Sequence, residues 1–209
     1  HFASLFLGLE TLTVSLYGLL AYLRTERQSL EAAIKYLVLA AMASGLLLFG
    51  IALLYAATGS LVFADVAVLS VDAFTTAGSP EAIWAAVGVL MLFAGFAFKL
   101  ALVPFHMWSP DVYQGAPAPV TALIATGSKG AVVAALLRLL SGVPADDALL
   151  PSVLATLAIL TMFGGNLLAL LQTDMKRMLA YSSIAHIGYL LVAMAAGGVV
   201  GSEAVVFYL

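Results

Sequence analysis

Residues 82–110 decide the fold class, and they read AIWAAVGVLMLFAGFAFKLALVPFHMWSP. The run is mainly apolar, carries no charge before Lys99 and has its first proline at Pro104. A helix needs roughly 20 mainly apolar residues to cross about 30 Å of hydrocarbon. We therefore expect a membrane-spanning helix here, with a lysine and a proline inside it.

The composition of the whole chain agrees with a membrane protein. Of its 209 residues, 64% are hydrophobic and only 9% are charged, whereas soluble domains are about half apolar and about a quarter charged. Alternating barrel strands are absent, so helices are the expected spanning elements. We predict an all-α polytopic transmembrane helix bundle, with residues 1–209 in one domain. The predicted spans are 2–23, 35–58, 82–113, 119–140, 152–171 and 179–200, with a seventh starting near residue 203 and the 82–113 span discontinuous.

Charges in the connections predict how the bundle is oriented. Loop 24–34 contains Arg24 and Arg27, and loop 172–178 contains Lys176 and Arg177, whereas loops 59–81 and 141–151 contain acidic residues and no Lys or Arg. Because Lys and Arg mark cytoplasmic loops, the first two are predicted to face the cytoplasm and the other two the opposite side. The chain opens at His1 directly before an apolar stretch and closes as another begins, so we expect an internal piece of a longer protein.

Several classes of function are excluded by what the chain lacks. It has no cysteine, which excludes iron–sulfur clusters, thiolate zinc sites, disulfides and cysteine nucleophiles. Three histidines argue against a multi-histidine metal centre, and a net charge of −3 argues against nucleic acid as a partner. No phosphate-binding loop, dinucleotide fingerprint or nucleophile–base motif occurs. We predict no covalent catalytic group, no metal site and no cofactor in this chain.

The informative residues are the charges inside the spans, Glu10, Lys99 and Lys129. A charge at the centre of a spanning helix costs about 2.5–3.5 kcal/mol even on the lenient insertion scale, so such residues point to function. Together they predict a hydrated path for protons. The structural alternative is an ion pair of Glu10 with Lys99 that only fixes helix packing. Lys35 lies near the predicted cytoplasmic interface, where a lysine can simply extend to water.

A break is predicted just after Lys99. Pro104 and Pro110 both lie in the predicted span, and a proline inside a helix removes a hydrogen bond and kinks or interrupts it. Interrupted helices at membrane depth are buried in protein or line a watery cavity, and transporters place their ion sites there. Lys99, the break and His106 therefore form one candidate site. His106 packed beside Trp108, with no role in transfer, is the alternative.

Four stretches resemble one family. Residues 98–120 read FKLALVPFHMWSPDVYQGAPAPV, and residues 5–10, 29–36 and 176–189 read LFLGLE, SLEAAIKY and KRMLAYSSIAHIGY. They resemble the antiporter-like membrane subunits of respiratory complex I, and the VYQGAP form is similar to the N type of bacterial subunit rather than the L or M types. The resemblance covers nearly the whole chain.

The resemblance implies a proton-translocating subunit of an NADH–quinone oxidoreductase in the bacterial inner membrane, with loops 59–81 and 141–151 periplasmic. It implies proton transfer through Glu10, Lys99 and Lys129, with Lys35 often included, and a pair between Glu10 and Lys99. The chain itself would carry out no redox catalysis. NADH, FMN, iron–sulfur clusters and quinone would bind partner subunits of the hetero-oligomer, in contact with lipid. The family usually has a proline soon after the glutamate, where this chain has Ser15, and the family's second half is absent.

Two other functions remain compatible with the sequence. A multisubunit cation/proton antiporter shares the buried lysine and the broken helix, although the Gln114-Gly115-Ala116-Pro117 segment argues against it. A membrane scaffold would use its buried charges only to specify helix packing. The scaffold predicts that replacing Lys99 harms assembly, whereas the pump predicts intact assembly with lost pumping.

Overall fold

The computed structural model describes residues 1–66, 79–143 and 149–209. Its elements are α1 (Phe2–Leu20), α2 (Arg27–Thr58), α4 (Pro80–Leu100), α5 (Trp108–Gly115), α6 (Ala118–Leu123), the π-helical turn η1 (Ile124–Ser128), α7 (Lys129–Leu140), α8 (Leu149–Leu170), α9 (Met175–Ala196) and α10 (Gly198–Tyr208). No strand occurs in the described residues. Six helices in this part of the chain are long and apolar enough to cross a membrane, with α6, η1 and α7 counting as one. The all-α prediction is confirmed.

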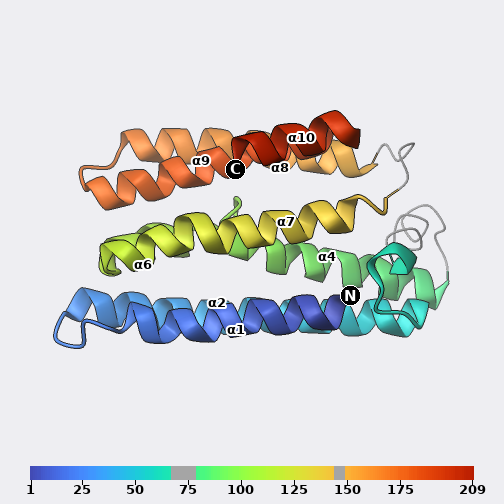
Figure 1. The fold of residues 1–209 in the computed structure, drawn as a ribbon, viewed down its shortest axis with the longest axis horizontal. Coiled ribbons are helices and arrows are strands. Elements are labelled where there is room, and N and C mark those ends of the chain that lie inside the picture. The colour runs from blue at the N-terminus through green and yellow to red at the C-terminus, as the bar shows by residue number, and fades with distance from the viewer. Residues whose placement is uncertain (67–78, 144–148) are drawn as a thin grey trace.

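The helices run side by side in three layers (Figure 1). α1 and α2 form one outer layer, α4 lies with α6 and α7 in the middle, and α8, α9 and α10 form the other outer layer. The loop between α1 and α2 and the loop between α8 and α9 lie at the same end of the bundle. The basic residues of the predicted loops 24–34 and 172–178 therefore lie toward one end of the bundle, as the charge pattern requires of a bundle that alternates direction.

Glycines allow the closest approaches between helices. A Cβ on Gly88 of α4 would lie 3.0 Å from the Gly50 carbonyl oxygen of α2, and one on Gly165 of α8 would lie 2.7 Å from a backbone nitrogen of α9. Small residues are expected at such interfaces in membranes. Gly197 and Gly198 do not serve as close packing points of this kind. A Cβ on either would meet nothing within 4 Å, and their φ angles of 65° and 60° place them in the turn between α9 and α10.

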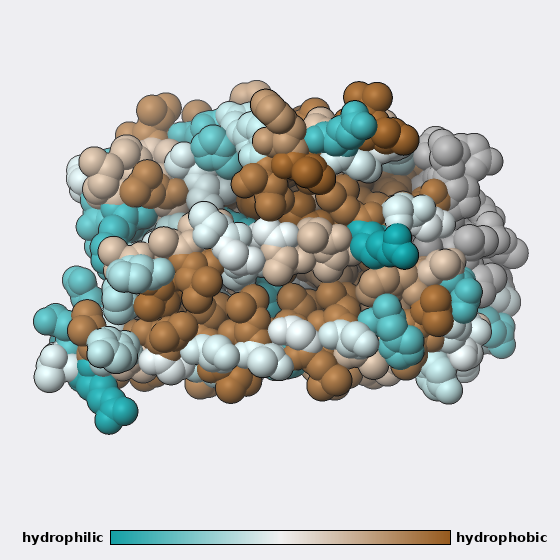
Figure 2. All heavy atoms as spheres, in the orientation of Figure 1, coloured by the Kyte–Doolittle hydropathy of each residue, from teal (hydrophilic) through white to brown (hydrophobic). Residues whose placement is uncertain are grey.

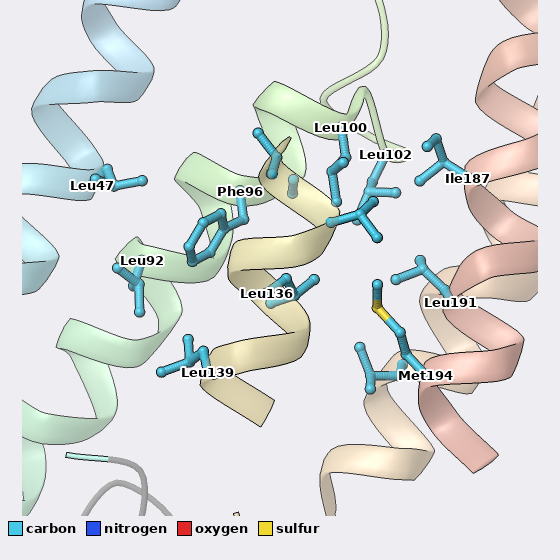
Figure 3. Close-up of a cluster of buried hydrophobic side chains, with 14 of the residues drawn as sticks. Leu47, Leu92, Phe96, Leu100, Leu102, Leu136, Leu139, Ile187, Leu191 and Met194 are labelled. Atoms are coloured by element: carbon cyan, nitrogen blue, oxygen red, sulfur yellow. The ribbon is translucent and has the colours of Figure 1, made fainter. Parts of the chain in front are cut away.

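The main apolar core lies between the layers. In Figure 3, side chains from α2, α4, α7 and α9 converge on the middle of the bundle, among them Leu47, Phe96, Leu136 and Leu191, each at most 2% exposed. Apolar side chains also cover much of the outer face in Figure 2, and hydrophilic ones gather around the α1–α2 loop. An exposed apolar surface of this extent suits contact with lipid or with further membrane helices.

Some helix ends differ from the predicted span limits. α2 begins at Arg27, eight residues before the predicted position 35, because the charged residues at its start remain helical beyond the apolar stretch. α9 begins at Met175, where the Asp174 side chain accepts a hydrogen bond from the Arg177 N–H and caps the helix. α10 begins at Gly198 rather than near residue 203. Basic residues predicted in loops thus lie on helix ends.

Candidate functional site

The break in the third span lies directly after Lys99. α4 ends at Leu100, Ala101 adopts a left-handed conformation with φ 58°, and α5 begins at Trp108. Pro104 lies in the non-helical segment between them, whereas Pro110 lies in the first turn of α5, where a proline removes no helical hydrogen bond. The Trp108 indole N–H donates to the Phe98 carbonyl at 2.9 Å, which satisfies a backbone group at the end of α4.

Lys99 is a buried lysine held by a hydroxyl. It lies in the last turn of α4, where the partial negative charge of the helix end favours a cation, and it is 6% exposed. Its ammonium donates to Thr13 Oγ1 of α1, which is fully buried. The broken helix thus brings a charged side chain into the interface between α4 and α1.

Glu10 lies on α1 near Lys99 and is also bound to a hydroxyl. Its carboxylate accepts a hydrogen bond from Ser44 of α2. Among the residues that the structure describes, the ion pairs join Lys35 to Glu31, Lys35 to Asp111 and Arg177 to Asp111, and none joins Glu10 to Lys99. The pair that the resemblance implied is therefore replaced by two hydroxyl contacts. Sequence reasoning missed Thr13 and Ser44, which are signalled only as polar residues in apolar helices.

Lys129 is the most enclosed cation of the site. It follows the π-helical turn η1, a feature often found at functional sites, and is 2% exposed. Its ammonium donates to Ser183 Oγ of α9 at 2.7 Å and lies 5.8 Å from the centre of the Tyr113 ring. The Tyr113 hydroxyl is 3.4 Å from the same serine oxygen. Lys129, Tyr113 and Ser183 thus form one polar cluster where α5, α7 and α9 meet.

His106 lies in the break itself and is 8% exposed. Neither of its ring nitrogens has a hydrogen-bond partner among the described residues, and the same is true of the Ser109 hydroxyl. Its ring is 6.4 Å from that of Tyr181. Buried polar atoms without a partner are unfavourable, and in proteins they are usually satisfied by an internal water molecule. Buried polar atoms without a hydrogen-bond partner thus occur in the break, at His106, and in the first turn of α5, at Ser109.

Lys35 lies outside this interior, in an ionic network at the end of the bundle that carries the basic loops. Asp111 of α5 accepts from Lys35 of α2 at 2.8 Å and from Arg177 of α9 at 2.6 Å. A polar hollow of about 130 Å³ adjoins Lys35 and Asp111. Lys176 donates to the Ala116 carbonyl at 2.9 Å, next to the end of α5. The network ties the short half of the broken helix to both outer layers.

Asp174 lies just outside the spanning helices, as the N-cap of α9, and contacts Gln114 and Arg177 at the same end of the bundle. The hydrogen bond from the Arg177 backbone N–H holds the pKa of its carboxyl below the usual value, and the Gln114 amide acts in the same direction. Its carboxylate is therefore stabilised in the folded chain.

Long apolar helices, one of them broken beside a buried lysine, place the chain among polytopic helical membrane proteins with a discontinuous helix, the kind of helix on which transporters form ion sites. The chain belongs to the NADH:quinone oxidoreductase/Mrp antiporter transmembrane family, whose model matches residues 1–209. Because that match spans the whole chain, every group of the candidate site lies within the family's region.

Curated relatives are NADH-quinone oxidoreductase subunits N. The protein of Chromohalobacter salexigens is 53% identical over all of this chain and 43% of its own length. That of Nitrosospira multiformis is 50% identical over 92% of this chain and 37% of its own length. The chain thus spans about two fifths of the length of these relatives.

Solved structures with the same fold include chains from three different complexes. A chain of respiratory complex I from Thermus thermophilus is 40% identical, with a TM-score of 0.77, over 100% of this chain and 44% of that one. A chain of an archaeal membrane-bound sulfane sulfur reductase is 34% identical, with a TM-score of 0.82, over 99% and 41%. A chain of the Mrp complex from Dietzia is 25% identical, with a TM-score of 0.84, over 98% and 37%.

Proposed function

We propose that this chain is part of a proton-translocating membrane subunit of a bacterial NADH–quinone oxidoreductase, and that residues 1–209 belong to one antiporter-like transmembrane domain. The observation that carries the proposal is the buried Lys99 at the end of a broken spanning helix. The identity of about 50% to curated subunits N supports the choice of complex. The partners are then other membrane subunits, and NADH, FMN, iron–sulfur clusters and quinone bind elsewhere in the complex.

In this proposal, the buried cations exchange protons along the middle of the bundle. Lys99 and Lys129 are the two enclosed carriers, and Glu10 supplies a carboxylate on α1, three residues before the Thr13 hydroxyl that Lys99 contacts. His106 lies in the break and can accept a proton on either ring nitrogen. Lys35, beside the polar hollow, is the point of exchange with water at the end that carries the basic loops. That end faces the cytoplasm, and the loops 59–81 and 141–151 face the periplasm.

A second candidate is a subunit of a multisubunit cation/proton antiporter. The TM-score of 0.84 to a chain of the Mrp complex from Dietzia favours it, although the sequence identity is only 25%. The two candidates differ in what drives transport: quinone reduction by NADH in the first, and the opposing gradient of another cation in the second.

The test is Lys99→Ala in the complete subunit within its assembled complex. Assembly is followed by native gel, and proton pumping driven by NADH is followed in membrane vesicles. Arg138→Ala is the control, because Arg138 is an exposed cation near the end of α7. We expect normal assembly for both variants, with pumping lost only in Lys99→Ala.

Two outcomes would contradict the proposal. Pumping that survives in an assembled Lys99→Ala complex would make Lys99 a packing charge, as the scaffold reading predicts. Parent vesicles that move protons only when another cation is supplied, and not with NADH, would favour the antiporter.

A further inference from the structure

We propose that Thr13 is a positioning residue that holds the Lys99 ammonium apart from the Glu10 carboxylate, while Ser44 holds that carboxylate. The inference rests on the proposed function, because it concerns how the buried lysine is kept ready to exchange a proton. It stands on the contacts of two hydroxyl groups, neither of which was a candidate from the sequence.

The hydrogen bonds of Thr13 fix the direction in which its hydroxyl acts. Thr13 Oγ1 donates to the Leu9 carbonyl at 2.6 Å within α1. Its one proton is therefore committed to the backbone, and only its oxygen lone pairs remain for Lys99, whose ammonium donates to it. Thr13 is fully buried, so water does not compete for this contact. The hydroxyl thus serves as a fixed acceptor for the lysine.

Glu10 and Thr13 offer Lys99 two acceptors on one helix face. They are three residues apart on α1, and residues with this spacing are neighbours on a helix surface. At a rise of about 1.5 Å per residue they lie about 4.5 Å apart along the axis. In the structure the lysine is bound to the neutral acceptor, and the charged acceptor is engaged by Ser44 of α2. The two arrangements differ in which of these neighbouring acceptors on α1 binds the lysine ammonium.

The choice of acceptor decides how firmly the lysine is held. A direct pair with a carboxylate inside a protein is far stronger than the same pair in water, because the dielectric is low. A lysine paired with Glu10 would leave that position only at a large cost. Bound to Thr13, it remains close to the carboxylate and keeps its freedom to move. We therefore infer that, without the Thr13 hydroxyl, the Lys99 ammonium forms a direct ion pair with the Glu10 carboxylate.

The alternative explanation for the Thr13 hydroxyl is purely structural, because threonine hydroxyls in helices commonly donate to a carbonyl of the preceding turn. Two neighbours do the same: Thr11 donates to the Leu7 carbonyl at 2.8 Å, and Ser15 donates to the Thr11 carbonyl at 2.7 Å. Both of those hydroxyls are exposed, and Thr13 is buried against Lys99. Thr11 is therefore a matched control that carries the backbone bond without the lysine contact.

The experiment compares Thr13→Val, Thr13→Ser and Thr11→Val in the complete subunit of the assembled complex. Pumping driven by NADH is measured in vesicles, normalised to the amount of assembled complex on native gels. We expect Thr13→Val to lower pumping by about tenfold, which corresponds to about 1.4 kcal/mol. Thr13→Ser, which keeps the hydroxyl, and Thr11→Val should stay near the parent rate. In a structure of the Thr13→Val complex by electron cryomicroscopy, the Lys99 ammonium should lie within about 4 Å of the Glu10 carboxylate, the limit for an ion pair.

Three results would overturn the inference: parent-like pumping in assembled Thr13→Val, an equal loss in Thr13→Ser, or Lys99 still apart from Glu10 in the variant structure. If the valine variant fails to assemble, Thr13→Ala compared with Thr11→Ala gives the same comparison. Lys99→Ala separates the two proposals. If it abolishes pumping while Thr13→Val pumps normally, the proposed function stands and the positioning role of Thr13 is refuted.

Discussion

Replacing Asp111 with asparagine tests how the short helix α5 is held in place. One carboxylate oxygen of Asp111 accepts from Lys35 at 2.8 Å, and the other accepts from Arg177 at 2.6 Å. An asparagine keeps one acceptor oxygen but presents an amide NH₂ to the second cation. One contact is therefore lost, and the remaining one no longer involves a carboxylate.

The free energy lost in Asp111→Asn depends on how far the three charged side chains are exposed to solvent. The Asp111 side chain is 34% exposed, and those of Lys35 and Arg177 are 42% and 28% exposed, so solvent screens both pairs in part. Exposed pairs contribute about 0.2–1 kcal/mol each, and hydrogen bonds to charged groups about 1.5–3 kcal/mol. A loss of about 1–2 kcal/mol lies between these limits.

The assay measures the temperature at which half of the assembled complex is lost, as judged on native gels after heating. Glu31→Gln is the control, because its pair with Lys35 is 55% exposed on the glutamate side and of the i,i+4 kind, which contributes about 0.2–0.5 kcal/mol. The double variant Asp111→Asn with Arg177→Gln should lose less than the sum of the two single losses, by about 1 kcal/mol. Equal midpoints for Asp111→Asn and Glu31→Gln, or strict additivity, would refute the bridging role of Asp111.

Two further predictions concern the α8–α9 hairpin. Gly165→Val should reduce the amount of assembled complex on native gels, since its Cβ would lie 2.7 Å from a backbone nitrogen of α9; parent-like assembly would contradict this. Asp174 has a lowered pKa, so its stabilising effect is complete above the unfolded value of about 4 and is lost as the pH falls through the folded value. Asp174→Asn, which caps without titrating, should therefore melt below the parent at neutral pH, and the difference should shrink only as the pH falls below about 4 toward the folded value. A difference independent of pH would contradict this reasoning.

The helix bundle was predictable because one signal dominates it. Long apolar runs interrupted by polar loops define the helices, and Pro104 identified the broken one. The exact helix ends were less predictable, because α2 continues as a helix beyond its apolar stretch as far as Arg27. The turn at Gly197 and Gly198 was also missed, because a glycine needed for a positive φ and a glycine needed for close packing look alike in a sequence.

The candidate site was predictable in its charges but not in its contacts. Lys99, Lys129 and Glu10 stand out in any apolar helix, because a charge there is costly. Their partners Thr13, Ser183 and Ser44 do not stand out, because a hydroxyl in a membrane helix can bond to its own backbone at little cost. Which hydroxyl contacts which charged group depends on how the helices pack against one another. The order of residue types along the chain does not reveal that packing.

The choice of hydroxyl partners has a physical consequence for transport. Lys99 and Lys129 are both buried, and each donates to a neutral oxygen on a different helix from its own. A carboxylate partner would fix a cation in one place, because an ion pair in a low-dielectric interior is expensive to break. A hydroxyl replaces part of the hydration that the buried ammonium has lost, and it does not fix the ammonium in one place. The same contrast separates the interior from the ionic network at Asp111, where full ion pairs hold α5 to α2 and α9. Ion pairs at the partly exposed end of the bundle therefore hold the short helix α5, and neutral hydroxyl acceptors hold the two buried lysines.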